Sequence, residues 1–100
     1  MRAVQYSKQA EADLAEILDY STDKWGEVRA TAYLTDLVDC FEQIAKMPKL
    51  GRTCFLIHPG FRRIERGRHV IFYRPMRRGI FISRVLHQSM LPTHDRLLDD

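Results

Sequence analysis

Four histidines are the first candidates for chemistry in this chain, because imidazole is the usual acid, base and zinc ligand near neutral pH. His69 and His87 fall on predicted strands, whereas His58 and His94 fall in a loop and a C-terminal tail. No two have i, i+4 spacing on a predicted helix, and none lies in a Cys–His cluster. We therefore expect no metal and no cofactor. We expect each strand histidine to be held by a hydrogen bond to one ring nitrogen.

RNA cleavage is a reaction that the polar residues could serve. It needs a group that takes the 2′-hydroxyl proton, a donor to the leaving oxygen and cations on the phosphate. Five residues have suitable types: Tyr73, His69, His87, Arg63 and Arg84. Such types are common, and the sequence shows no Gly-rich phosphate loop, G-x-S-x-G motif or paired carboxylates. The sequence therefore favours a protein that binds a macromolecule, and RNA cleavage is the alternative.

The charge of the 100-residue chain differs between its halves. Residues 1–50 hold six lysines and arginines against nine acids, a net charge of −3. Residues 51–100 hold ten cations, all arginine, against four acids, a net charge of +6. Arginine pairs with carboxylate or phosphate through parallel hydrogen bonds, so this half predicts an acidic partner, either protein or nucleic acid. Arg62, Arg63, Arg66 and Arg74 lie on adjacent predicted strands, where some of them would form a cationic stripe on one sheet face.

A short strand and a helical hairpin are predicted for the first half. Residues 2–6 alternate in polarity, and Ser7 caps a helix that ends near Asp23. Trp25-Gly26 connects it to a second helix, which Pro48 and Gly51 close. The second helix keeps i, i+3, i+4, i+7 apolar spacing for four turns: Ala30, Tyr33, Leu34, Leu37, Val38, Phe41, Ile44 and Ala45. The aromatic side chains of Tyr20, Trp25 and Tyr33 lie close to the apolar stripes, so we expect them in the core.

Three strands are predicted for the second half, near residues 61–66, 68–75 and 79–87, with turns at 65–68 and 76–79. The pattern predicts an α+β fold, with the hairpin packed on a small antiparallel-dominated sheet. Apolar residues are consecutive at 70–73 and 80–82, so both sheet faces are apolar. Because the hairpin covers one face, we expect a partner protein on the other, in preference to the tail.

The chain fits a single domain, residues 1–100, with residues 88–100 as its tail. No run of 18 apolar residues and no export signal is present, which argues against a membrane protein. Cys40 and Cys54 lack C-x-x-C spacing, so we expect buried thiols and a cytoplasmic protein.

Three segments of the second half resemble one known family. They are G-F-R-R at 60–63, H-V-I-F-Y-R at 69–74 and R-V-L-H-Q-S-M at 84–90. In this order and spacing, together with Tyr6-Ser7, Trp25-Gly26 and Ala32-Tyr33 in the first half, they resemble the ParE toxins of bacterial type II toxin–antitoxin modules. These toxins belong to the wider RelE/ParE fold group. The resemblance spans nearly the whole chain and implies a β-α-α-β-β-β order.

The resemblance implies a toxin without a catalytic site that inhibits DNA gyrase and is neutralised by a ParD-like antitoxin. We expect no sequence-specific DNA binding by this chain itself. The antitoxin is expected on an apolar groove flanked by arginines, formed by Leu34, Leu37, Val70, Phe72, Arg62, Arg63 and Arg74. The gyrase contact is expected on the last strand and tail, at Arg84, His87 and Met90. A RelE-like mRNA endonuclease and a chain that retains antitoxin binding alone are the alternatives.

Overall fold

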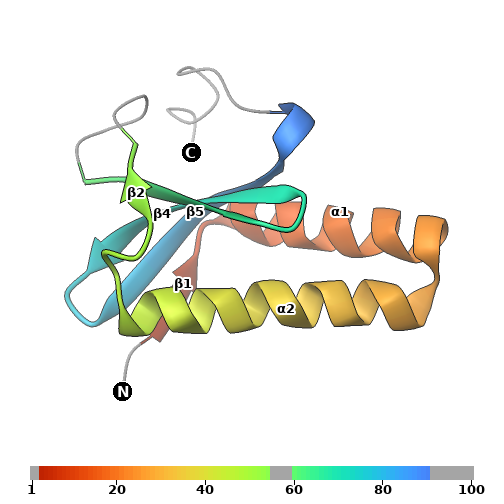
Figure 1. The fold of residues 1–100 in the computed structure, drawn as a ribbon, viewed down its shortest axis with the longest axis horizontal. Helices are drawn as coiled ribbons and strands as arrows, with labels where there is room; N and C mark the ends of the chain where they lie inside the picture. The colour runs from red at the N-terminus through yellow and green to blue at the C-terminus, as the bar shows by residue number, and fades with distance from the viewer. Residues whose placement is uncertain (1–2, 55–59, 91–100) are drawn as a thin grey trace.

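The fold has two layers, a helical hairpin and a five-stranded sheet (Figure 1). The computed structural model describes residues 3–54 and 60–90. Its elements are β1 (Ala3–Tyr6), α1 (Lys8–Trp25), α2 (Glu27–Lys46), β2 (Arg52–Thr53), β3 (Arg62–Arg66), β4 (His69–Met76), β5 (Gly79–His87) and a 3₁₀ turn, η1 (Gln88–Met90). The α+β class predicted from periodicity is confirmed.

The sheet is mixed, with strand order β1-β5-β4-β3-β2. All neighbouring strands are antiparallel except β1 and β5, which run parallel with Ala3 opposite Gly79. A Cβ atom on Gly79 would lie 1.9 Å from the carbonyl oxygen of Ala3, so only glycine lets β1 approach this closely. The two-residue strand β2 is absent from the sequence prediction because two residues show no alternation.

The helices differ from the prediction at two places. α1 continues to Trp25, two residues past Asp23, and stops at Gly26, whose positive φ of 88° suits glycine. Tyr20 is 58% exposed, so its expected place in the core is wrong. Within residues 3–54 and 60–90, no helix combines the length and apolar character that a membrane span needs.

The main core lies between the hairpin and the sheet. It joins Leu37, Phe41 and Ile44 of α2 to Ile71 and Tyr73 of β4, all of them 0% exposed. The apolar spacing of α2 and alternate residues of the strands thus meet, as the two periodicities require. Cys40 also packs here, and both cysteines are buried thiols, as predicted.

A second apolar cluster lies on the other face of the sheet. Val70, Phe72 and Leu86 pack there with Cys54, and Phe61 packs against them. Both sheet faces are apolar, as the consecutive strand residues predicted. No partner is needed to bury Val70 and Phe72, which are only 2% and 1% exposed within the chain, whereas the expected docking of a partner on this face stays a prediction. The residues flanking the β2–β3 connection, Cys54 and Phe61, close over a face that the sequence pattern left open.

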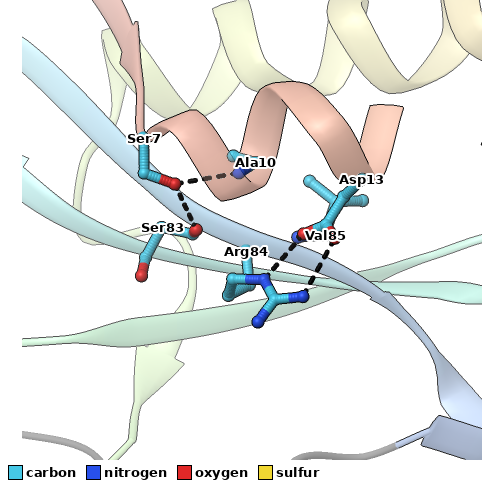
Figure 2. Close-up of polar contacts among 6 residues, drawn as sticks. All are labelled: Ser7, Ala10, Asp13, Ser83, Arg84 and Val85. Atoms are coloured by element: carbon cyan, nitrogen blue, oxygen red, sulfur yellow. Dashed lines mark hydrogen bonds and ion pairs between the residues drawn. The ribbon is translucent and has the colours of Figure 1, made fainter. Parts of the chain in front are cut away.

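The start of α1 is fixed to β5 by hydrogen bonds on the edge that β1 leaves open (Figure 2). β1 pairs with β5 only as far as Ile82, and the Ser7 N–H donates to the Ile82 carbonyl at 3.0 Å. The Ser7 hydroxyl accepts from the Ala10 N–H at 2.9 Å, which caps the helix, and donates to the Ser83 carbonyl at 2.7 Å. One serine therefore starts the helix and attaches it to the strand.

Asp13 continues this attachment nearly two turns later (Figure 2). Its carboxylate accepts from Arg84 Nε at 2.9 Å and from Arg84 Nη2 at 3.0 Å, and also from the Val85 N–H at 3.0 Å. The Asp13 and Arg84 side chains are 10% and 18% exposed, so the pair is mostly removed from water. A buried charge requires such complete pairing, and removal of one partner leaves the other uncompensated.

Asp13→Asn should lower the free energy of unfolding by about 2–4 kcal/mol, because it leaves the Arg84 charge uncompensated in a poorly solvated site. Asp36→Asn is the matched control, since Asp36 also makes two hydrogen bonds to an arginine, Arg66, but the two side chains are 46% and 39% exposed. Solvent screens that pair, so its loss should be much smaller. Urea denaturation measures both variants, and equal losses would contradict the anchoring role of Asp13.

Candidate functional site

The four arginines of the predicted stripe are divided between the two sheet faces. Residues opposite each other on antiparallel strands share a face, and Arg63 is opposite Phe72 whereas Arg62 is opposite Tyr73. Arg62 and Arg66 therefore lie on the helix side. Arg62 donates to the Gly51 carbonyl at 2.6 Å, and Arg66 pairs with Asp36.

Arg63 and Arg74 lie on the face away from the helices, where each guanidinium covers an aromatic ring. Arg63 is 5.6 Å from the ring centroid of Phe72, and Arg74 is 4.9 Å from that of Phe81. Such contacts stabilise by roughly 0.5–1 kcal/mol at an exposed site and hold the cation in place. The buried Nε of Arg63 has no hydrogen-bond partner in the part of the chain described here. We call Arg63, Arg74 and Phe81 the arginine face.

The predicted apolar groove is not a single surface. Leu37 is buried in the main core, while Val70 and Phe72 are buried in the second cluster on the opposite face. Leu34 is half-buried at the edge of the main core. The sheet thus separates Leu34 and Leu37 from Val70 and Phe72, and of these four only Leu34 keeps an appreciable exposed surface.

The five residues considered for RNA cleavage are also dispersed. The Tyr73 hydroxyl is enclosed, donating to the Pro48 carbonyl at 2.8 Å and accepting from the Gly51 N–H at 2.8 Å. His69 is four residues away along β4, about 13 Å at the rise of a strand. Arg84 is paired with Asp13, and Arg63 lies on the sheet face away from Tyr73, opposite Phe72. These residues do not converge on one reacting group.

His69 and His87 face each other across β4 and β5, with ring centroids 5.4 Å apart. Each ring is held at Nδ1, as predicted: His69 lies 2.6 Å from the Tyr33 hydroxyl, and His87 accepts from the Ser89 N–H at 3.1 Å. Tyr33 accepts from the Arg68 N–H and contacts the Trp25 ring edge to face. Sequence reasoning missed Tyr33 as a site residue because its helical spacing indicated core packing alone.

The environment of His69 favours the neutral ring. Burial and then the neighbouring His87 lower the pKa of His69, Asp13 opposes the shift, and the result is a pKa of about 4. No group of three or more metal-binding side chains occurs among residues 3–54 and 60–90. The pair is therefore suited to hydrogen bonding near neutral pH.

The remaining predicted contact residues end β5 and follow it. Arg84 is engaged by Asp13, which gives it a part in the fold. Met90 ends η1, and residues 91–100 of the predicted tail lie outside the described residues, as does His58. Whether Arg84, His87 and Met90 contact gyrase stays a prediction.

Acidification should destabilise the protein through His69. Its folded-state pKa of about 4 lies below the unfolded value of about 6.5, so the unfolded chain binds more protons in between and stability falls as pH drops through that window. After allowance for solvent screening of a half-exposed ring, the loss is about 1–2 kcal/mol. His69→Asn, which retains an acceptor for Tyr33, should lose less between these pH values in urea denaturation. An identical pH slope in both proteins would contradict this assignment.

Known proteins are similar to this chain in both sequence and fold. The family model described as "ParE toxin of type II toxin-antitoxin system, parDE" matches residues 4–92. "Toxin ParE1" of Mycobacterium tuberculosis is 42% identical over 85 residues, covering 84% of this chain and 87% of that protein. "Toxin ParE1" of Caulobacter vibrioides is 41% identical over 90 residues, covering 90% of this chain and 93% of that protein.

A solved structure from Pseudomonas aeruginosa, titled "Chromosomal ParDE TA system from P. aeruginosa", has the same fold. Its TM-score is 0.72 at 24% identity, covering 87% of this chain and 96% of that chain. The family model covers most of this chain, and both relatives match this chain over most of their own length. The chain therefore belongs to the ParE toxin family of type II toxin–antitoxin systems.

Proposed function

We propose that this ParE family toxin inhibits DNA gyrase by protein–protein binding and is neutralised by a ParD-like antitoxin. Membership of the toxin family, over residues 4–92, is the observation that carries the proposal. The RelE-like alternative, cleavage of mRNA, has less support because the candidate acid–base and phosphate-binding residues do not form one site. The Tyr73 hydroxyl in particular is committed to the backbone of Pro48 and Gly51.

The antitoxin contact is proposed on the arginine face and on the exposed surface near Leu34. Arg74 presents a cation over Phe81, and Arg63 lies over Phe72 with its Nη2 3.3 Å from a carboxylate oxygen of Glu65. Cations beside aromatic surface suit a partner segment that combines acidic and apolar residues. Leu37 is buried on the Leu34 side of the sheet, and Val70 and Phe72 are buried on the side of the arginine face, so none of the three is itself a contact residue. Electrostatic complementarity of this kind contributes to association rate and to partner choice.

Replacing both arginines, Arg63→Gln with Arg74→Gln, should weaken antitoxin binding by roughly tenfold at low salt and reduce its salt dependence. The measurement is isothermal titration calorimetry of the purified toxin with the ParD-like antitoxin encoded beside it. Arg29→Gln is the matched control, an exposed arginine on α2 and far from the arginine face in sequence and fold. Equal weakening by the control, or no weakening by the double variant, would contradict the assignment of this face.

The gyrase contact is proposed at the end of β5 and in the residues beyond it. His87 is partly exposed there and Ser89 is exposed, and neither belongs to the main core or to the second apolar cluster. A contact on this segment would leave the arginine face available to the antitoxin. The two binding activities would then be separable.

Purified toxin should cause trapped DNA breaks or lost supercoiling when incubated with gyrase and plasmid, and should leave translating mRNA intact in a parallel reaction. A chain lacking residues 88–100 should lose the effect on gyrase and keep antitoxin binding within about threefold, because neither the main core nor the second apolar cluster of the described residues includes any of them. Cleaved message with unimpaired gyrase would refute the proposed target. Loss of both bindings in a truncated chain that still melts cooperatively would refute the separation of surfaces.

A further inference from the structure

A pocket of about 360 Å³ lies between α1 and the ends of β4 and β5. Ile17 and Trp25 of α1 line one side, and Val85 and Leu86 of β5 line the other. The pocket is large enough for one sizeable side chain, and apolar walls of this kind with a few polar groups are typical of binding sites. Asp13 fixes α1 to β5 at its margin, so the two walls are held at a constant separation.

The hydrogen-bond network behind the pocket determines which atoms the histidines offer. The N–H of Ser89 donates to Nδ1 of His87 at 3.1 Å, and the Ser89 hydroxyl lies 2.7 Å from the same nitrogen, so Nδ1 accepts and Nε2 is the ring nitrogen that can donate. Tyr33 already accepts from Arg68 N–H and has its own proton to donate, which makes Nδ1 of His69 the acceptor and places the His69 proton on Nε2 as well. Both imidazoles therefore offer N–H donors.

The polar groups that line the pocket are arranged asymmetrically. His69 of β4, His87 of β5 and Arg68, in the turn before β4, can each donate; the Arg68 guanidinium is 5.8 Å from the Trp25 ring centroid. The Ser89 hydroxyl is already engaged, because it lies 2.7 Å from Nδ1 of His87. The two carboxylates that line the pocket, Asp13 and Glu16, lie on α1. Asp13 already accepts three hydrogen bonds, two from Arg84 and one from the Val85 N–H, so its charge is largely compensated.

We propose that this pocket is a binding site for an apolar side chain with an adjoining carboxylate, presented by a partner protein. The carboxylate would lie against the donors of His69, His87 and Arg68, and the apolar part against Ile17, Trp25 and Leu86. The two imidazole N–H groups and the Arg68 guanidinium favour this ligand class, since a carboxylate accepts hydrogen bonds from all three and charge-assisted hydrogen bonds are the stronger kind. The pocket would bind such a segment whichever enzyme the toxin acts on.

A small probe tests the site directly. N-acetyl-L-phenylalanine carries an aromatic ring beside a carboxylate, and its primary amide is the same molecule without the charge. Trp25 is the one tryptophan of the sequence, so its fluorescence reports occupancy. We expect the acid to change Trp25 emission with a Kd on the order of 1 mM, and the amide to bind at least about fivefold more weakly.

Three variants locate the effect. His87→Leu, checked for folding by its thermal transition, should weaken binding of the acid by about fivefold, since it removes a donor. Glu16→Gln, on the exposed side of α1, should tighten it about twofold by removing a repelling carboxylate. Asp36→Asn on α2 should leave it unchanged. Equal binding of acid and amide, or Glu16→Gln weakening the acid, would overturn the proposal, as would a silent Trp25 up to about 20 mM probe.

Discussion

The carboxylate of Asp13 is the constraint on which the arrangement of this toxin depends. β1 covers only the first half of β5, so the backbone N–H of Val85 requires a partner from elsewhere. Asp13 supplies it from α1 and pairs with Arg84 at the same time, while the Ser7 hydroxyl, nearly two turns earlier, donates to the Ser83 carbonyl. Side chains at the start of α1 thus make hydrogen bonds to the part of β5 that β1 does not cover. Because α1 is placed by this edge, the pocket between α1 and the end of β5 has fixed walls.

Much of the fold could be predicted from the sequence because it rests on local periodicity. The apolar spacing of Leu37, Phe41 and Ile44 predicted α2, and the consecutive residues 70–73 predicted a strand with two apolar faces. The covering of the second face could not be predicted, because Cys54 and Phe61 reach it from a segment without regular spacing. Tyr20 was misplaced because its helical position resembles that of a core residue, yet its ring is mostly exposed.

The candidate site was predicted less well than the fold because its contacts join residues far apart in the sequence. Strand position alone predicted that His69 and His87 would each be held at one nitrogen, but not that Tyr33 of α2 would hold one of them. The arginine excess indicated a binding surface, and register then assigned Arg63 and Arg74 to one face and Arg62 to the other. Periodicity gave Asp13 no structural role, since an acid on an amphipathic helix is ordinarily solvated.

The chemistry of these surfaces is that of binding: cations over aromatic rings, imidazole N–H groups in an apolar pocket, and a tyrosine hydroxyl enclosed by backbone groups. The central claim is that the toxin acts by binding, and the number of toxin molecules needed to inactivate gyrase tests it most directly. Gyrase at a fixed concentration well above the dissociation constant should lose activity linearly as toxin is added, with an end point near one toxin per binding site. Complete inactivation by a small fraction of that amount, growing with incubation time, would show turnover and would contradict a toxin that acts by binding.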